Sequence, residues 1–210
     1  IIFFSVLIFF VISGFIIAHP FAKKLLEGGP MLSLKKYYTR RLTRLEPPYI
    51  INLIIIFVLL VVASGKSPQE LFSHLTASLF YLHNIVFGEH SLINGVAWSL
   101  EVECQFYLLA PFMTLVFRVS DRRLRRLILV AAIAIMSFLS YAYCGSKPRL
   151  QLSVLYYANY FLTGFLLADV YLTNWHEDPT TRYGWDVVSI LSWLALTGLL
   201  YCSKAWQMLL

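Results

Sequence analysis

The chain has 210 residues, of which 59% are hydrophobic and 13% are charged, and its mean hydropathy is +0.71. A soluble domain of this length could not bury so much apolar surface in one core, so the composition excludes an ordinary soluble protein. The formal charge of +6 does not indicate nucleic-acid binding, because the basic residues follow the ends of apolar segments and form no patch with interleaved aromatic residues. We therefore expect an all-α, multi-span transmembrane helical bundle.

Six apolar runs approach the length of about 20 residues that a membrane-spanning helix needs. They cover residues 1–19, 49–64, 98–117, 127–144, 153–172 and 187–203. Thirteen of the 17 Lys and Arg residues fall in the connections at 20–48, 118–126 and 173–186. The positive-inside rule therefore predicts that these three basic loops are cytoplasmic and that residues 65–97 lie outside.

The outer segment LFSHLTASLFYLHNIVF, at 71–87, is too polar for a span and too apolar for a free loop. We expect it to form an interfacial or re-entrant helix that lies over the bundle. No repeat or polar linker divides the chain, which predicts a single membrane domain over residues 1–210. Because the sequence begins at Ile1 inside one apolar run and ends in AWQMLL inside another, we expect this domain to be truncated at both ends.

The first span contains FFVISGF, at 9–15. Its small residues Ser13 and Gly14 allow another backbone or a ligand to approach closely. A contact between two helices would explain the same pair of residues, so the motif is a candidate site only in combination with others.

A basic motif follows in YYTRRLTRLEPPY, at 37–49. Arg41 and Arg44 lie three residues apart and share one helical face, just before Pro47 and Pro48 are expected to stop the turn. The planar guanidinium group bonds phosphate oxygens in pairs, so this face predicts a phosphate-bearing cytoplasmic donor such as a nucleotide or coenzyme A. Contact with anionic lipid headgroups is the simpler alternative.

The segment WSLEVECQFYLLAP carries two acids and an amide in an otherwise apolar run. On a regular helix, Trp98, Glu101 and Gln105 fall along one face. Glu103 points about 160° away from Glu101 and shares its side with Tyr107, so the two acids do not form a catalytic pair. Glu101 is expected to reach water near the outer boundary. Glu103 lies deeper, where a carboxylate needs a partner or a proton and is a functional candidate.

Taken in order, FFVISGF, RRLTRLEPPY and WSLEVECQFYLLAP resemble the acyltransferase 3 family of multi-span membrane proteins. The family's versions of these motifs are approximately FF-x-x-SGF, R-x-x-R-x-x-P and WSL-x-VEEQFY. The resemblance is close over residues 9–111 and general in the later spans. It implies O-acyl transfer, most simply of acetyl, from cytoplasmic acyl-CoA to a hydroxyl of a cell-surface or exported carbohydrate or glycolipid. It also implies a polysaccharide-modifying transferase of the bacterial inner membrane, with membrane lipid, acetyl-CoA and the acceptor as partners and no permanently bound cofactor.

Carried over position by position, the resemblance assigns donor binding to Arg41 and Arg44 and a supporting catalytic role to Glu103. The positions that it implies line the site are Ser13, Gly14, Trp98, Ser99, Gln105 and Tyr107. Two residues depart from the family pattern: Cys104 replaces the second Glu of the third motif, and Glu101 occupies its variable position.

The family's catalytic His belongs to the span before FF-x-x-SGF, so we expect it to precede residue 1 and expect this piece of the protein to be inactive by itself. Activation of a hydroxyl needs a base whose pKa is near neutrality. Of the outer-loop residues His74, His83 and His90, His83 is the best substitute base within the chain. An interfacial His that pairs with a backbone group or a lipid head is the simpler explanation of it.

Other functions have weaker support in the sequence. No spacing resembles a metal site, a phosphate-binding glycine loop or a G-x-S-x-G elbow. Cys144 and Cys202 could pair in an oxidising compartment, but packing as small apolar residues is the simpler role. A transporter or flippase for an amphipathic or acidic solute, which would use the buried polar groups as a pathway, stays an alternative. A catalytically silent relative that binds an acyl donor is another.

Overall fold

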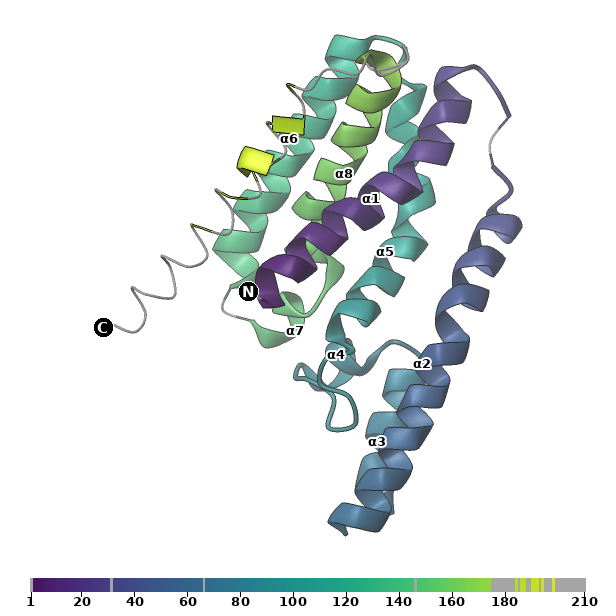
Figure 1. Ribbon diagram of the computed structural model, residues 1–210, viewed down its shortest axis with the longest axis vertical. Helices are drawn as coiled ribbons and strands as arrows, with labels where there is room; N and C mark the ends of the chain where they lie inside the picture. Colours follow the sequence, from purple (N-terminus) through teal and green to yellow (C-terminus); the bar gives the residue numbers. More distant parts are fainter. Residues whose placement is uncertain are drawn as a thin grey trace.

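The computed structural model describes residues 2–30, 32–65, 67–145 and 147–174, with isolated positions at 184, 186, 187, 190–192, 194 and 198. Within these residues the regular secondary structure is helical, without a strand, and the all-α prediction is confirmed. The elements in chain order are α1 (Ile2–Leu26), α2 (Leu34–Ser64), α3 (Pro68–Leu79), α4 (His83–Phe87), α5 (Trp98–Met113), the 3₁₀ turn η1 (Thr114–Arg118), α6 (Arg122–Leu139), the π-helical turn η2 (Ser140–Cys144), α7 (Pro148–Gln151) and α8 (Val154–Asn174) (Figure 1).

Among the described residues, five segments are long and apolar enough to cross a membrane. They are Phe4–Leu26, Leu34–Ala63, Trp98–Arg118, Arg122–Cys144 and Pro148–Asn174. They match five of the six predicted spans, whereas the sixth, at 187–203, lies outside the described residues except for isolated positions. The segment 71–87 forms two helices too short to span, α3 and α4. The chain is therefore an integral membrane protein.

The connection between the first two spans differs from the prediction of a basic loop over 20–48. α1 continues through Pro20, and α2 begins soon after, so the true connection is 27–33. Pro47 and Pro48 lie inside α2 and do not end it. Spanning helices tolerate proline because neighbouring groups can satisfy the backbone that proline leaves free.

α1, α5, α6 and α8 form the packed bundle, and α2 stands beside it with α3 along its far end (Figure 1). α1 and α8 approach so closely that a Cβ atom at Gly14 would overlap the carbonyl oxygen of Phe161. A Cβ atom at Gly164 would likewise overlap the carbonyl oxygen of Val11. Small residues permit such an approach between membrane helices, and this contact sets the position of α1.

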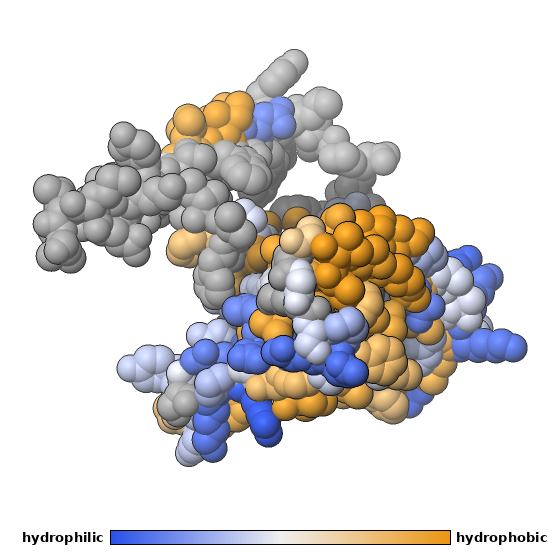
Figure 2. All heavy atoms as spheres, turned by 90° about the horizontal axis from the view of Figure 1, so that it is seen from below, coloured by the Kyte–Doolittle hydropathy of each residue, from blue (hydrophilic) through white to orange (hydrophobic). Residues whose placement is uncertain are grey.

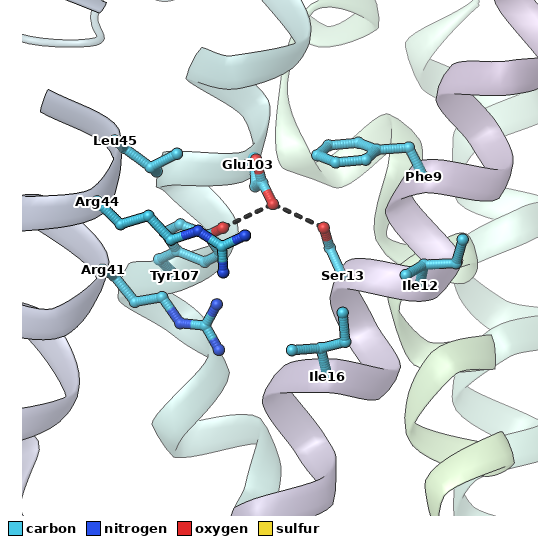
Figure 3. A pocket seen from close by; sticks show the side chains of 9 residues that line it. All are labelled: Phe9, Ile12, Ser13, Ile16, Arg41, Arg44, Leu45, Glu103 and Tyr107. Atoms are coloured by element: carbon cyan, nitrogen blue, oxygen red, sulfur yellow. Dashed lines mark hydrogen bonds between the residues drawn. The ribbon is translucent and has the colours of Figure 1, made fainter. Parts of the chain in front are cut away.

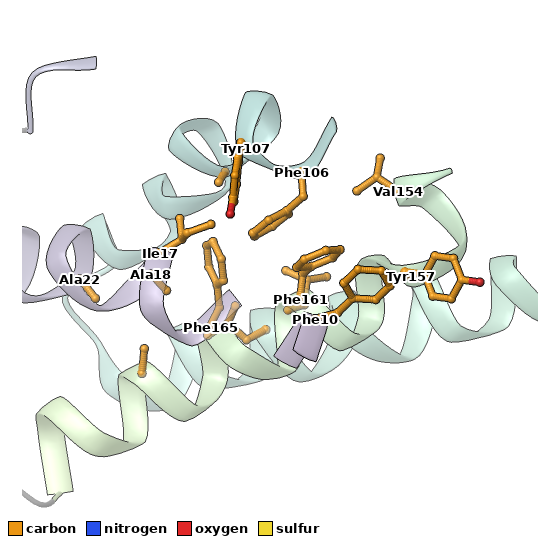
Figure 4. Close-up of a cluster of buried hydrophobic side chains, with 14 of the residues drawn as sticks. Phe10, Ile17, Ala18, Ala22, Phe106, Tyr107, Val154, Tyr157, Phe161 and Phe165 are labelled. Carbon is orange, nitrogen blue, oxygen red and sulfur yellow. The ribbon is translucent and has the colours of Figure 1, made fainter. Parts of the chain in front are cut away.

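A stack of aromatic rings fills the centre of the bundle (Figure 4). The rings of Phe106 and Phe161 are stacked with centroids 3.9 Å apart, and Phe10 lies 4.8 Å from Phe161. Packing of this kind contributes about 0.5–1.5 kcal/mol per ring pair beyond the buried area. Because the core joins α1, α5 and α8, the residues of α1 and α5 that face α2 are held in fixed relative positions.

The outer surface of the spans is apolar. Viewed from the end at which α3 lies, hydrophobic side chains make up a large part of the visible surface (Figure 2). Exposed examples on α2 are Val58 and Val62, and on α6 Leu127 and Phe138. At the opposite end of the bundle, α1 ends with Lys23 and Lys24 in its last turn and α6 begins with Arg122 and Arg123 (Figure 1).

Candidate functional site

A pocket of about 150 Å³ lies between α1, α2 and α5, beside the aromatic core. Its lining residues are Phe9, Ile12, Ser13, Ile16, Arg41, Arg44, Leu45, Glu103 and Tyr107 (Figure 3). All three motifs singled out in the sequence contribute to it, although Ser13 and Glu103 are 90 positions apart in the chain. The structure thus brings five predicted site residues into one space.

Glu103 is the buried acid of this pocket, with 3% of its surface exposed. Its Oε1 accepts a hydrogen bond from Ser13 Oγ and another from Tyr107 Oη, each at 2.6 Å. Tyr107 lies one turn further along α5, and Ser13 reaches across from α1. The predicted shared side of Glu103 and Tyr107 is confirmed, and the two hydroxyl groups supply the partners that a buried carboxylate needs.

Two arginines of α2 face Glu103 across the pocket. Arg41 and Arg44 share one helical face, as predicted, and their guanidinium groups point into the pocket (Figure 3). The guanidinium carbon of Arg41 lies 5.4 Å from the ring centroid of Tyr107 and 5.9 Å from that of Tyr37. Within the described residues neither arginine forms an ion pair, and with two positive charges against one negative charge the pocket is electropositive.

Two tyrosines attach the start of α2 to α5. Pro111 has no N–H group, so the carbonyl of Tyr107, four residues earlier, loses its donor within the helix. The hydroxyl of Tyr37 donates to that carbonyl at 3.2 Å, and Tyr38 donates to the carbonyl of Leu108 at 3.2 Å. These contacts hold the arginine-bearing turns of α2 against the pocket. The arginines therefore lie in a helix that continues into a span, and not in a loop as predicted.

Four residues expected to line the site lie elsewhere. Gly14 belongs to the contact of α1 with α8. The ring of Trp98 packs 5.5 Å from that of Tyr157, and Gln105 Oε1 accepts the backbone N–H of the first residue of α8 at 2.9 Å. Ser99 is half-buried and does not line the pocket. Gly14, Trp98 and Gln105 therefore contact α8 and help to position it against α1 and α5.

His83, the first residue of α4, lies in a second polar cluster with His74 of α3 and does not line the pocket. It is fully buried, and its Nε2 lies 2.7 Å from Nδ1 of His74. Burial of the imidazole, and then the neighbouring His74, lower the pKa of His83. His83 is therefore not among the residues that surround Glu103 in the pocket, and its role as a substitute base stays a prediction.

Glu101 joins this second cluster, and the expectation that it reaches water is wrong. It is 1% exposed, and its Oε2 accepts the backbone N–H of Asn84 at 2.9 Å. The side-chain amide of Asn84 in turn donates to the carbonyl of Trp98 at 3.0 Å. Glu101 is buried because it satisfies the otherwise free donors at the start of α4.

A buried ion-pair group between α6 and α8 was missed in the sequence. Asp169 is fully buried and bonds the Nε atoms of Arg125 and Arg126, the latter at 2.8 Å. Arg125 also donates to the carbonyl of Val119 at 2.7 Å, and Arg126 donates to Thr173 Oγ1 at 2.7 Å. The signal was present, since Asp169 is an acid inside the predicted span 153–172, and such a residue requires a partner.

Comparison with known proteins supports the family indicated by the motifs. A family model described as an acyltransferase domain matches residues 1–209. An uncharacterized protein of Haemophilus influenzae is 25% identical, over 92% of this chain and 85% of its own. Peptidoglycan O-acetyltransferase OatA of Listeria monocytogenes is 32% identical over 55% of this chain, and a putative O-acetyltransferase of Staphylococcus aureus is 25% identical over 92% of it.

The alignments cover 20% of the Listeria protein and 35% of the Staphylococcus protein, so this chain spans only part of both. No solved structure matches the chain. The family model nevertheless covers almost all of the sequence, and it includes the three motifs whose residues meet in the pocket. The chain belongs to the acyltransferase 3 family.

Proposed function

We propose that the protein is a membrane O-acyltransferase that moves an acyl group, most simply acetyl from acetyl-CoA, to a hydroxyl group of a carbohydrate. The observation that carries the proposal is the convergence of Ser13, Arg41, Arg44, Glu103 and Tyr107 on one pocket. The names of two relatives, a peptidoglycan O-acetyltransferase and a putative O-acetyltransferase, support acetyl as the transferred group and a glycan as the acceptor.

The two arginines would bind the phosphates of coenzyme A. Their guanidinium groups enter the pocket from α2 and have no carboxylate partner within the described residues. A guanidinium group donates two parallel hydrogen bonds to a phosphate, and two such groups three residues apart suit a diphosphate. The basic ends of α1, α2 and α6 would then be cytoplasmic, which is the side that supplies acyl-CoA in a bacterial inner membrane.

Glu103 would act as a supporting residue of the reaction. Its carboxylate holds the hydroxyl groups of Ser13 and Tyr107 at 2.6 Å and so fixes the polar wall opposite the arginines. None of the nine lining residues is a histidine. The family resemblance places the base that accepts the proton of the attacking hydroxyl on a histidine of another span.

The test is transfer of labelled acetyl from acetyl-CoA to a glycan acceptor by the complete gene product in membranes. Arg44→Ala removes a charged hydrogen-bond donor, which is worth about 1.5–3 kcal/mol, and should raise KM for acetyl-CoA about tenfold or more. Glu103→Gln should lower kcat with little change in that KM. Arg123→Ala, at an exposed arginine outside the pocket, removes the same charge and should leave both constants unchanged. Unchanged transfer in both Arg44→Ala and Glu103→Gln would contradict these roles.

A further inference from the structure

One wall of the pocket is apolar and faces outward. Phe9, Ile12 and Ile16 line the pocket from α1, and they are 43%, 50% and 49% exposed. They lie three and four residues apart, so they form one strip along the helix. α1 is long and apolar enough to span a membrane, and the described residues leave this strip exposed, so the pocket is open on the side of Phe9, Ile12 and Ile16.

The opposite wall carries positive charge that the protein itself does not neutralise. Arg41 and Arg44 belong to a spanning helix and form no ion pair within the described part of the chain. Glu103, which also faces the pocket, already receives two hydroxyl hydrogen bonds on Oε1. The charged donors of Arg41 and Arg44, next to the apolar strip, make the pocket complementary to an anion that carries an apolar chain.

The size of the pocket restricts how such an anion would bind. Sites that enclose a whole small-molecule ligand usually measure about 300–1,000 Å³, and this pocket measures about 150 Å³. It therefore accommodates a phosphate group but not the aliphatic chain attached to it. The chain can lie along the strip of Phe9, Ile12 and Ile16, where it remains in contact with the bilayer.

We propose that the pocket binds the phosphate of a membrane lipid that enters sideways, with the phosphate on Arg41 and Arg44 and the chain along the strip. The inference shares its two arginines with the proposed donor site but depends only on the geometry of the pocket. Since coenzyme A offers the same phosphate chemistry from the aqueous side, the two ligands compete for the arginines. The lipid is the phosphate source that the apolar wall favours.

The proposal can be tested by native mass spectrometry of the purified complete protein with phosphatidic acid as the probe. Diacylglycerol, with the same chains and no phosphate, and inorganic phosphate, with no chain, are the reference ligands. Three variants separate the two walls. Arg41→Gln with Arg44→Gln removes the charges. Ile12→Trp narrows the opening beside the strip, and Val62→Trp places the same ring at an exposed position of α2 outside the pocket.

We expect the double arginine variant and Ile12→Trp to bind phosphatidic acid at least tenfold more weakly, and Val62→Trp to bind it like the wild type. Retained binding in all variants, or equal binding of diacylglycerol, would overturn the proposal, since both indicate ordinary contact with bilayer lipid. Displacement of phosphatidic acid by an equal concentration of inorganic phosphate would overturn the role of the strip.

Binding of coenzyme A separates this proposal from the proposed function. Coenzyme A should bind Val62→Trp as it binds the wild type and should bind the double arginine variant more weakly, because its phosphates reach the arginines from the aqueous side. A wild-type protein that binds phosphatidic acid but not coenzyme A would refute the donor assignment and leave the lipid site intact. The reverse result would refute the lipid site alone. Equal melting temperatures of the variants would show that each comparison is made on folded protein.

Discussion

Two buried acids of this protein each face a pair of arginines, and the two arrangements differ in whether the charges meet. Asp169 bonds Arg125 and Arg126, and these arginines are further held by Val119 and Thr173. Glu103 faces Arg41 and Arg44 but bonds two hydroxyl groups, with no ion pair to either arginine in the described chain.

The difference separates a structural charge group from one that is open to a ligand. Around Asp169 the carboxylate bonds both arginines directly, so the group joins α6 to α8. Around Glu103 the carboxylate accepts from the tyrosine and serine hydroxyl groups, and within the described residues the two arginines form no ion pair. Arg41 is half-buried and Arg44 is exposed, so their charged donors are accessible to an anion that enters the pocket.

Replacement of the carboxylate by an amide should therefore change the stability of the protein much more at Asp169 than at Glu103. Asp169→Asn leaves Arg125, which is 2% exposed, without its counter-charge, and breaking a buried pair costs roughly 3–5 kcal/mol. We expect a large fall in melting temperature in detergent or loss of the folded protein. Glu103→Gln keeps an oxygen acceptor for both hydroxyl groups and should melt close to the wild type.

Glu70→Gln is the control for this comparison, because Glu70 is exposed on α3 and its substitution should change stability by less than about 0.5 kcal/mol. If Asp169→Asn and Glu70→Gln had the same melting temperature, the ion pairs would not stabilise the bundle. The proposed contrast between the two acids would then be lost.

A smaller effect is expected at Gly14, next to the site residue Ser13. Gly14→Ala places a Cβ atom against the backbone carbonyl of Phe161, which cannot move without shifting α8. Overpacking of this kind costs about 1–3 kcal/mol. Thermal unfolding should show the loss, whereas Gly95→Ala, whose added atom meets only ordinary contacts, should not. A Gly14→Ala variant as stable as Gly95→Ala would mean that α1 and α8 pack less tightly than described.

Ser13→Ala tests the pocket side of the same turn. It removes one of the two hydroxyl donors to Glu103, whereas Tyr107→Phe removes the other. Each loss leaves Oε1 of the carboxylate with one of these two hydroxyl donors and should cost about 1.5–3 kcal/mol of interaction with Glu103. We expect lower acyl transfer in both variants. The fold-loss of the double variant should be smaller than the product of the two single fold-losses, since both hydroxyl groups bind one acceptor. Strict independence of the two effects would indicate that they act on different groups.

Helical periodicity predicted much of the pocket from the sequence. Spacing alone placed Arg41 with Arg44 and Glu103 with Tyr107, because side chains three or four residues apart share a face whatever the helix packs against. The same rule separated Glu101 from Glu103. The motif order then suggested that these faces belong to one site, and the structure brings them together around one space.

What periodicity could not supply is the partner of each face. Gly14 and Gln105 resemble site residues in their motifs, but their neighbours are Phe161 and the start of α8, which are far away in the sequence. Proline was equally ambiguous. The sequence rule that proline ends a helix failed at Pro47, because that rule describes helices in water, where no neighbouring span holds the chain in place.

The smallest predicted effect concerns a third buried group, the histidine pair of α3 and α4. His83 and His74 share one hydrogen bond between α4 and α3. Glu89 and His90 face His83 from the following loop, Glu101 approaches from α5, and Arg149 of α7 lies beside Gly88. Burial and the second imidazole make the protonated form of His83 unfavourable in spite of Glu89.

A His with a lowered pKa in the folded state binds fewer protons than the same His in an opened state, whose pKa is about 6.5. The closed α3–α4 cap is therefore favoured above that pH and loses stability as the pH falls below it. Hydrogen exchange of the α4 amides, corrected for the intrinsic rate, should show lower protection at pH 5.5 than at pH 7.5. His83→Gln should abolish this difference, because its side chain does not titrate, whereas His90→Gln, at an exposed residue, should retain it. Equal protection of α4 at both pH values in the wild type would show that His83 accepts a proton without opening the cap.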